Sequence, residues 1–478
     1  MKNGIKYGYR VFALILISFS VSAQPTADTT AVTDNAIYGD TIYTVGKIII
    51  TGNKKTKDVI ILREIPFREG EQYTSSALHG KFRDAHRQLL NTSLFHTVDI
   101  SIKEVLRQTA TIAVVLRERW YFFPSPFFKP IDRNLNQWLV EQKASLARVN
   151  YGIKFIYYNF TGRNDKFKGS FGTGYTKQFS LGYERLYFDK KLRWGFNVGF
   201  SYSKNKEVNY NTIHDKQVFV KDDDVFLSNY TNAQIILTYR RKIKTKHSAG
   251  IIYTRGQIDD TVVTLNPSYY KNDLQMVSYP EFIYNLSYFN VDFIPYPTKG
   301  YAANLSFNKK GFNNRVNVWQ LGVQALGSWH LGKKSFFNVG VYGGLKLPFT
   351  QPYFSQRFLG YGDIYMQGYE YYVVDGVAGG YLKTGIYHEL FSFKIKSPPL
   401  KKGKDPLFIP FRIIGKMYGN SGYVHNPQPG NNSLSNRMLY SGGFGIDIIT
   451  FYDIVIKLEY SFNQLGENGL FLHRKSIF

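Results

Sequence analysis

Residue types that carry covalent chemistry are present, but without the spacing that such chemistry needs. The chain has no Cys, which excludes a thiol nucleophile, disulfides, Cys-ligated zinc and iron–sulfur clusters. Its nine His are scattered without metal-ligand spacing, and P-loop, H-E-x-x-H and G-x-S-x-G patterns are absent. We expect no enzyme activity, no catalytic residue, no metal site and no cofactor. A Ser/His hydrolase site is the enzymatic alternative, and activity lost on a single Ser change would reveal it.

Composition leaves two classes of protein. Lys and Arg number 60 against 35 Asp and Glu, so the net charge is +25, and at 44% hydrophobic residues the chain is not disordered. A mean hydropathy of −0.27 excludes a bundle of transmembrane helices. A large globular protein or a membrane β-barrel remains. The 17% of aromatic residues favours the barrel, whose alternating strands hold many aromatic side chains.

The first residues predict export. Lys2, Lys6 and Arg10 precede an apolar stretch at 11–22 that is too short to span a bilayer, and small residues follow at 21–23. We interpret 1–23 as a signal peptide, with a buried N-terminal helix as the alternative. Its three basic residues leave a mature net charge of +22. Because exported proteins seldom meet nucleic acid, we expect anionic lipids or acidic polypeptides as the electrostatic partners.

A small α+β domain follows a flexible leader at 24–41. The pattern predicts strands and helices in the order βααββ, with both helices on one face of a three-stranded sheet. We expect Thr56 to cap the first helix, and Thr74 or Ser75 the second. The expected elements are strand 45–51, helix 57–64, helix 77–91, strand 97–104 and strand 109–117.

The rest of the chain alternates with period two. In the run 453–462, Ile454, Leu458 and Tyr460 share one face, and Lys457 and Glu459 share the other. Alternation over about ten residues is typical of a transmembrane barrel, because strands of soluble sandwiches average about 5–6 residues. The same rule places the carboxylate of Asp447 inside the barrel.

Sixteen strands are expected, an even number as bacterial single-chain barrels require. They lie at 137–146, 152–159, 164–174, 177–187, 192–206, 231–242, 245–257, 280–293, 300–309, 316–332, 335–346, 381–395, 408–419, 439–449, 451–462 and 469–477. The four longest connections, at 207–230, 258–278, 347–380 and 420–437, all fall on one side. Only 396–407 is long on the other side.

Residues 42–120 resemble a POTRA domain, the periplasmic polypeptide-binding module of outer-membrane assembly proteins. The resemblance is carried by Gly52 and Asn53 after the first strand and by Asn91, Leu94 and Phe95 before the second. It implies that a sheet edge receives an extended client strand, since unpaired backbone groups template pairing with little demand on sequence. The alternative is a spacer that binds nothing. Residues 121–136 are expected to be a linker.

Residues 137–478 resemble the barrel of the BamA/TamA superfamily, the bacterial surface antigen barrels that insert or translocate proteins at the outer membrane. The motifs that carry this resemblance are 159–165 (NFTGRND), 295–300 (PYPTKG), 358–361 (FLGY), 366–370 (MQGYE), 443–447 (GFGID) and the terminal Phe478. With the α+β POTRA domain, the implied fold is a βααββ unit followed by an all-β, 16-stranded antiparallel transmembrane barrel. The implied location is the outer membrane, with the POTRA domain in the periplasm.

A loop motif carries the sharpest site hypothesis. In the superfamily an Arg in this loop pairs inside the lumen with an acidic strand residue, whereas this chain has Gln367, followed by Gly368, Tyr369 and Glu370. We expect Gln367 to contact Asp447, at roughly 1.5–3 kcal/mol for a hydrogen bond to a charged group. A solvated Gln367, or another base such as Arg357 holding the loop, is the alternative.

The resemblance implies assembly of outer-membrane proteins or polypeptide translocation, without covalent chemistry. Its expected partners are unfolded polypeptides, lipids including lipopolysaccharide, and accessory lipoproteins. Client strands would pair where the first strand (137–146) meets the last (469–477), and polar residues at 136–143 and at 474–475 fit either a weak closure or interfacial charges. A dedicated secretion channel, a passive pore and a structural scaffold are the alternatives.

Overall fold

The computed structural model describes residues 41–130, 146, 149–189, 191–396 and 408–473. The expected signal peptide, nearly all of the leader, the strand predicted at 137–146 apart from Leu146, and Phe478 lie outside the described residues. Within the described part of the chain, no helix is long and apolar enough to cross a membrane.

The N-terminal domain has the predicted order with one added strand. Its elements are β1 (Ile42–Thr51), α1 (Asp58–Glu64), β2 (Gln72–Thr74), α2 (Ser75–Asn91), β3 (Phe95–Leu106) and β4 (Thr109–Glu118). The sheet order is β2-β1-β4-β3, so the sheet has four strands and not the predicted three. The prediction missed β2 because three residues are too few to show alternation.

Helix caps decide where the helices begin. The hydroxyl of Thr74 accepts a hydrogen bond from the backbone N–H of Ala77, as predicted for the start of α2. Thr56 does not cap α1: the N-cap residue is Lys57, without a side-chain bond. The Thr56 hydroxyl instead meets the hydroxyl of Tyr121 at 3.1 Å. The apolar face of α2, with Leu78, Phe82, Ala85 and Leu89, is buried in the core of this domain.

Sixteen of the remaining strands form one antiparallel sheet, in the order β24-β23-β22-β21-β20-β17-β16-β15-β14-β13-β12-β9-β8-β7-β6-β5. They are β5 (Phe122–Pro130), β6 (Val149–Tyr158), β7 (Lys166–Gly174), β8 (Thr176–Tyr187), β9 (Trp194–Asn205), β12 (Ser228–Tyr239), β13 (Thr245–Ile258), β14 (Met276–Val291), β15 (Gly300–Lys310), β16 (Val318–His330), β17 (Ser335–Leu347), β20 (Ala378–Lys396), β21 (Phe408–His425), β22 (Met438–Thr450), β23 (Ile454–Asn463) and β24 (Asn468–His473). Fifteen of these match predicted strands.

The prediction was wrong about the first barrel strand. β5 lies within the predicted linker at 121–136 and pairs with β6 along its whole length. Its sequence contains Pro124 and Pro126, which lack a backbone N–H and are rare inside a sheet. Proline is tolerated here because β5 is an end strand of the ladder, where one row of backbone groups needs no partner inside the sheet.

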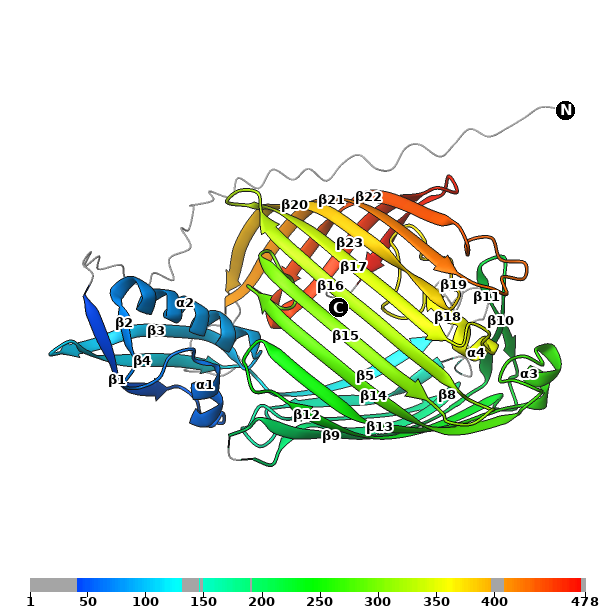
Figure 1. Cartoon of the computed structure of the whole chain (residues 1–478), viewed down its shortest axis with the longest axis horizontal. Coiled ribbons are helices and arrows are strands. Elements are labelled where there is room, and N and C mark those ends of the chain that lie inside the picture. Colours follow the sequence, from blue (N-terminus) through cyan, green and yellow to red (C-terminus); the bar gives the residue numbers. More distant parts are fainter. Residues whose placement is uncertain (1–40, 131–145, 147–148, 190, 397–407, 474–478) are drawn as a thin grey trace.

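Connections differ between the two ends of the barrel, as predicted. The long ones carry β10 (Glu207–Ile213), β11 (Lys216–Lys221), α3 (Asp260–Leu265), α4 (Tyr353–Gln356), β18 (Arg357–Leu359) and β19 (Val374–Asp375). Figure 1 shows these elements at the end opposite the POTRA-like domain. That domain lies against the short connections, which we call the inner turns. The predicted exception, 396–407, falls almost wholly outside the described residues.

Candidate functional site

Three charged side chains meet inside the barrel on three neighbouring strands. Lys416 of β21 places its Nζ 2.5 Å from Oδ1 of Asp447 on β22 and 2.6 Å from Oε1 of Glu459 on β23. All three side chains are at most 2% exposed. Alternation explains their inward position, since Phe444 and Ile446 next to Asp447 are strongly exposed on the outer face. The carboxylate of Asp447 lies on the same face of the sheet as Lys416 and Glu459.

The loop at 348–377 enters the lumen, but its Gln367 does not contact Asp447. The Nε2 of Gln367 donates to Oε1 of Glu459 at 3.1 Å, so the predicted partner was wrong by one strand. The oxygens of Asp447 already face Lys416 and the hydroxyl of Tyr296, at 2.8 Å. Lys416 on the barrel wall therefore supplies the positive charge beside Asp447. The resemblance implies that an Arg on the loop would supply it.

The next residues of the motif hold the loop to the wall through neutral groups. The carbonyl of Gly368 accepts from Nδ2 of Asn463 at 2.8 Å, and the Tyr369 hydroxyl donates to the carbonyl of Tyr440 at 3.1 Å. Gly368 has a φ of +89°, and a Cβ there would lie 3.0 Å from Ser441, so glycine suits this close approach. The loop is inside the barrel, as expected.

His473 of β24, the last strand, contacts the charged cluster of Lys416, Asp447 and Glu459. Its Nδ1 lies 2.5 Å from Oε2 of Glu459, and its Nε2 lies 3.7 Å from Oε1 of Glu370 in the loop. The ring of Tyr365, also in the loop, stacks on the His473 ring. The loop thus touches β22, β23 and β24, the strands next to one end of the ladder. Arg357, the other candidate base, packs instead over the ring of Tyr361.

Tyr296 joins this cluster from the inner end of the barrel. It belongs to the predicted 295–300 motif, which forms the inner turn between β14 and β15. Its ring is 2% exposed and packs with Phe336, Ile414 and Ile449. Asp447 is therefore a common partner of an inner turn and of the neighbouring strand β21.

A second set of contacts fixes the POTRA-like domain to the inner turns. Glu64 at the end of α1 receives Nη1 and Nη2 of Arg240 at 2.6 and 2.9 Å, and Nη2 of Arg63 at 3.0 Å. Arg119 places Nη1 2.7 Å from Oδ2 of Asp453 in the turn between β22 and β23. Two bidentate ion pairs therefore span this junction.

Residues of the predicted POTRA signature serve the junction as well as the domain. Asn91 donates to the carbonyl of Asp292 at 3.5 Å and accepts from the N–H of Ile294 at 3.1 Å. Leu94 and Phe95 are buried in the domain core. Gly52 has a φ of +88°, and Asn53 donates to the carbonyl of Thr56 at 2.9 Å. These residues shape the end of the domain that faces the barrel.

The 159–165 motif completes the junction. Nδ2 of Asn159 donates to the Thr56 hydroxyl at 2.9 Å, and the carbonyl of Gly162 accepts from the N–H of Lys57. Gly162 has a φ of +82°, and a Cβ there would lie 2.3 Å from the carbonyl oxygen of Lys55. Only glycine allows this approach without a shift of the backbone.

Titration of the junction is set by burial and by its arginines. Burial alone would raise the pKa of Glu64, but Arg240 and Arg63 overcome this effect and lower it. Burial, together with Arg119 and Arg117, lowers the pKa of His96 to about 4, against an opposing effect of Asp453. At neutral pH Glu64 is charged and His96 is neutral.

The sequence did not single out Glu459 and Lys416 of the barrel cluster, or the pair of Glu64 and Arg240 at the junction. Alternation had placed Glu459 inward, but nothing in the pattern selected it over Asp447 as the partner of the loop. Lys416 lies between the buried Ile414 and Tyr418, an alternation that could have indicated its inward position. The pairing of Glu64 with Arg240 joins residues 176 positions apart and leaves no local signal.

Two family models match the chain. The POTRA model, described as a surface antigen variable number repeat, matches residues 43–119, and the Omp85 superfamily domain matches residues 159–381. The chain is similar to the Omp85 superfamily over the latter range, which is a little under half of its length. By both models it resembles an Omp85 barrel of the outer membrane with one POTRA domain on the periplasmic side.

Known Omp85-like proteins share limited sequence with this one. The outer membrane protein assembly factor BamA of Neorickettsia risticii (strain Illinois) is 28% identical over 172 residues, which are 35% of this chain and 20% of that relative. The match therefore spans about a fifth of the relative's length.

A solved structure shows the same fold. CdiB from Escherichia coli superposes with a TM-score of 0.53 at 11% identity, over 91% of this chain and 74% of that one. BamA from Haemophilus ducreyi lacking POTRA domains 1–3 gives a TM-score of 0.49 at 15% identity, over 90% and 83% of the two chains.

Proposed function

We propose that this Omp85-like protein receives unfolded polypeptides in the periplasm and assembles them into, or moves them across, the outer membrane. One observation carries the proposal: a single POTRA domain is fixed by ion pairs to the inner turns of a barrel whose strand ladder has two ends, β5 and β24. Within the described residues, no pairing joins these two strands.

The two end strands support opening of the barrel wall. Within the described residues β24 pairs with β23 from Asn468 to His473, and β5 contains three prolines. A proline cannot donate to a partner strand, so it weakens any closure that uses its side of β5. Because each unpaired backbone group costs several kcal/mol in lipid, a client strand that pairs with such an edge is strongly stabilised. The edges of β5 and β24 are our proposed docking positions for clients.

The POTRA sheet offers another edge. β3 is the end strand of the sheet order and runs for twelve residues, from Phe95 to Leu106. Val105 and Leu106 at its far end are 47% and 74% exposed. An extended client strand adding to β3 would gain main-chain hydrogen bonds without a demand for one sequence. Anionic lipids, including lipopolysaccharide, and accessory lipoproteins are further proposed partners, suggested by the basic net charge.

Depletion followed by an inventory of outer-membrane proteins tests this function. Loss of many different barrels is the result that general assembly predicts. Loss of one secreted protein would point to dedicated secretion, and an unchanged inventory would contradict both and favour a scaffold. Conductance separates a passive pore, because a lumen occupied by the 348–377 loop should pass ions poorly until that loop is deleted.

A further inference from the structure

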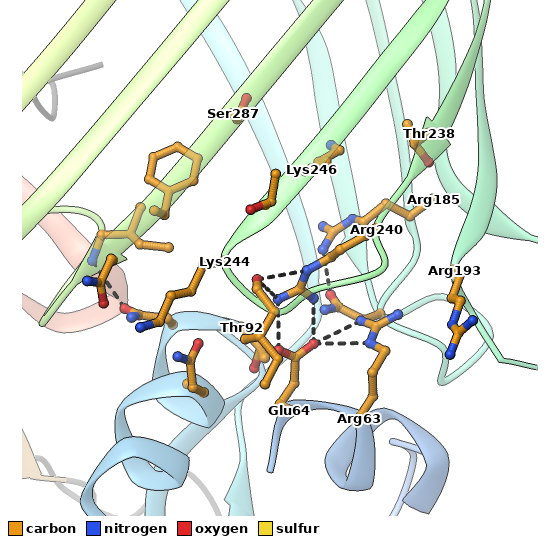
Figure 2. A pocket seen from close by; sticks show the side chains of 18 of the residues that line it. Arg63, Glu64, Thr92, Arg185, Arg193, Thr238, Arg240, Lys244, Lys246 and Ser287 are labelled. Atoms are coloured by element: carbon orange, nitrogen blue, oxygen red, sulfur yellow. Dashed lines mark hydrogen bonds and ion pairs between the residues drawn. The ribbon is translucent and has the colours of Figure 1, made fainter. Parts of the chain in front are cut away.

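A cavity of about 370 Å³ lies between the POTRA domain and the inner end of the barrel. Six cationic side chains line it: Arg63, Arg185, Arg193, Arg240, Lys244 and Lys246. Figure 2 shows them around the cavity, on α1, on strands of the barrel and on inner turns. The volume lies within the range of ligand-binding pockets.

Most of this positive charge has no counter-ion. The cavity has two carboxylates, and both are engaged: Glu64 with Arg63 and Arg240, and Glu184 with Lys166 and Lys168. Among the described residues, Arg185, Arg193, Lys244 and Lys246 form no ion pair. Like charges held together in a partly enclosed space repel one another unless an anion joins them. The cavity is therefore matched to an anionic ligand.

The backbone at Arg185 supports a binding role. Arg185 has a φ of +62°, in the left-handed region, at an irregularity in the pairing of β8 with β9. Its Nη1 donates to the amide oxygen of Asn164 at 2.7 Å, a neutral acceptor. Bulges and strained backbone positions often orient a side chain towards a ligand, and Arg185 has both features.

A second cleft, of about 1060 Å³, adjoins the cavity on the side of α1. The two share Arg63, Arg193, Arg240, Ile243, Lys244 and Thr245, so we treat them as one basic passage. The cleft adds further cations at Arg68, Lys191, Arg241 and Lys242. It also has an apolar wall on α1, where Val59 and Leu62 are 42% and 39% exposed.

We propose that the basic passage binds an extended polypeptide segment in which acidic and apolar residues occur together. Such a segment places carboxylates on the cations while its apolar side chains cover Val59 and Leu62. This inference rests on the proposed function, because it assigns a chemical class to the clients that pass from the POTRA domain to the barrel.

The position of the cations favours a polypeptide over a lipid. Arg185 and Lys246 lie on the strands of the inward face, since Leu186 and Ile251, of opposite orientation, are 45% and 53% exposed on the outer face. An acyl chain would have to leave the bilayer to bring its headgroup to them. A polypeptide arriving from the periplasm meets the cleft first and then the cavity.

Peptide binding to the full chain in detergent micelles tests the proposal. The probes are a fluorescent peptide of alternating Glu and Val, and matched peptides with Gln or Lys in place of Glu, measured by anisotropy. We expect the Glu peptide to bind at least about tenfold more tightly than the Gln peptide. Lys244→Gln combined with Lys246→Gln should remove most of that preference. The matched control is Lys333→Gln with Lys334→Gln, the same charge change in an inner turn that does not line the passage.

Equal affinity for the Glu and Gln peptides would overturn the proposal, as would an equal loss in the two double variants. So would displacement of the Glu peptide by phosphatidylglycerol micelles at matched charge, which would assign the site to a lipid. If the double variant does not fold, Lys244→Gln and Lys246→Gln are compared singly with Lys333→Gln. If the passage prefers the Glu peptide but depletion leaves the outer-membrane inventory unchanged, the peptide site stands and the proposed function is rejected.

Discussion

Arg240, in the turn between β12 and β13, donates hydrogen bonds from both terminal nitrogens to the carboxylate of Glu64 at the end of α1, at 2.6 and 2.9 Å. Glu64 is 1% exposed, so its charge has left water entirely. A buried carboxylate is tolerated only when it is paired and hydrogen-bonded, and here one partner comes from the POTRA domain and the other from the barrel. The orientation of the domain is therefore coupled to a single buried charge.

Arg240→Ala should loosen the α1 side of the junction between the POTRA domain and the barrel. Removing one partner of a buried ion pair costs about 3–5 kcal/mol, because the other charge stays buried with less compensation. Amide hydrogen exchange in α1 should become faster, with little change in β3, which lies outside the Glu64 contact. Arg241→Ala, the exposed neighbouring residue, is the control and should leave exchange in α1 unchanged. Equal protection of α1 in both variants would show that Arg240 does not hold the domain.

Acid should also loosen the junction, in two steps. The docked pKa of Glu64 lies below its ordinary value of 4.5, so its stabilising effect is present above pH 4.5 and is lost as the pH falls through the docked pKa. The pKa of His96 falls from 6.5 to about 4, so the undocked state takes up a proton first and stability declines between these values.

Spin-label distances between the POTRA domain and an inner turn would follow this release. The chain has no Cys, so labels at Leu106→Cys and Gly332→Cys are the only thiols. The distribution should broaden from pH 6.5 downwards and again below pH 4.5. His96→Gln should remove the first step alone. A distribution that is constant down to pH 4 would contradict the assignment.

Inside the barrel, the wall cation should matter more than the loop amide. Lys416→Met leaves Asp447 and Glu459 buried without their shared partner, at a cost of about 3–5 kcal/mol. Gln367→Ala removes one hydrogen bond to a charged group, roughly 1.5–3 kcal/mol. Thermal unfolding in detergent should rank the two variants in this order. The reverse ranking would mean that the loop contact dominates.

A compensating change sharpens that test. Gln367→Arg brings a cation beside Glu459, the position that the resemblance implies, so it should recover part of the stability lost in Lys416→Met. In the unchanged background the same substitution should add little, because Lys416 already neutralises the site. A double variant no more stable than Lys416→Met would show that the loop cannot supply the charge.

Tyr296→Phe should weaken the link between an inner turn and the barrel wall. It removes the 2.8 Å hydrogen bond to Asp447 and keeps the ring, so we expect a loss of roughly 1.5–3 kcal/mol. Tyr253→Phe is the control, because Tyr253 is 49% exposed on the outer face of β13. Unfolding measured for both variants should differ by most of that amount. Equal stability would assign Tyr296 to packing alone.

Local patterns predicted what depends on local physics. Period-two alternation located fifteen strands and predicted the inward position of Asp447, and helical spacing located α2. It failed at β5, where prolines hide an end strand, and at β2, which is too short to alternate. The partner of Gln367 depends on how deeply the loop enters the lumen, and no local sequence pattern predicts that depth. The pairing of Glu64 with Arg240 depends on how two domains meet, and it left no signal.

Opening of the barrel wall between β5 and β24 is the central claim, and cross-linking those strands tests it most directly. Cysteines at Phe128 and Leu472, whose side chains are 56% and 68% exposed, would be joined by a bis-maleimide, and insertion of an unfolded barrel protein into vesicles would be measured. The control pair, Tyr460→Cys and Leu470→Cys, joins strands that are already paired. We predict that the first cross-link abolishes insertion and the second leaves it intact. Full insertion with β5 joined to β24 would contradict the account.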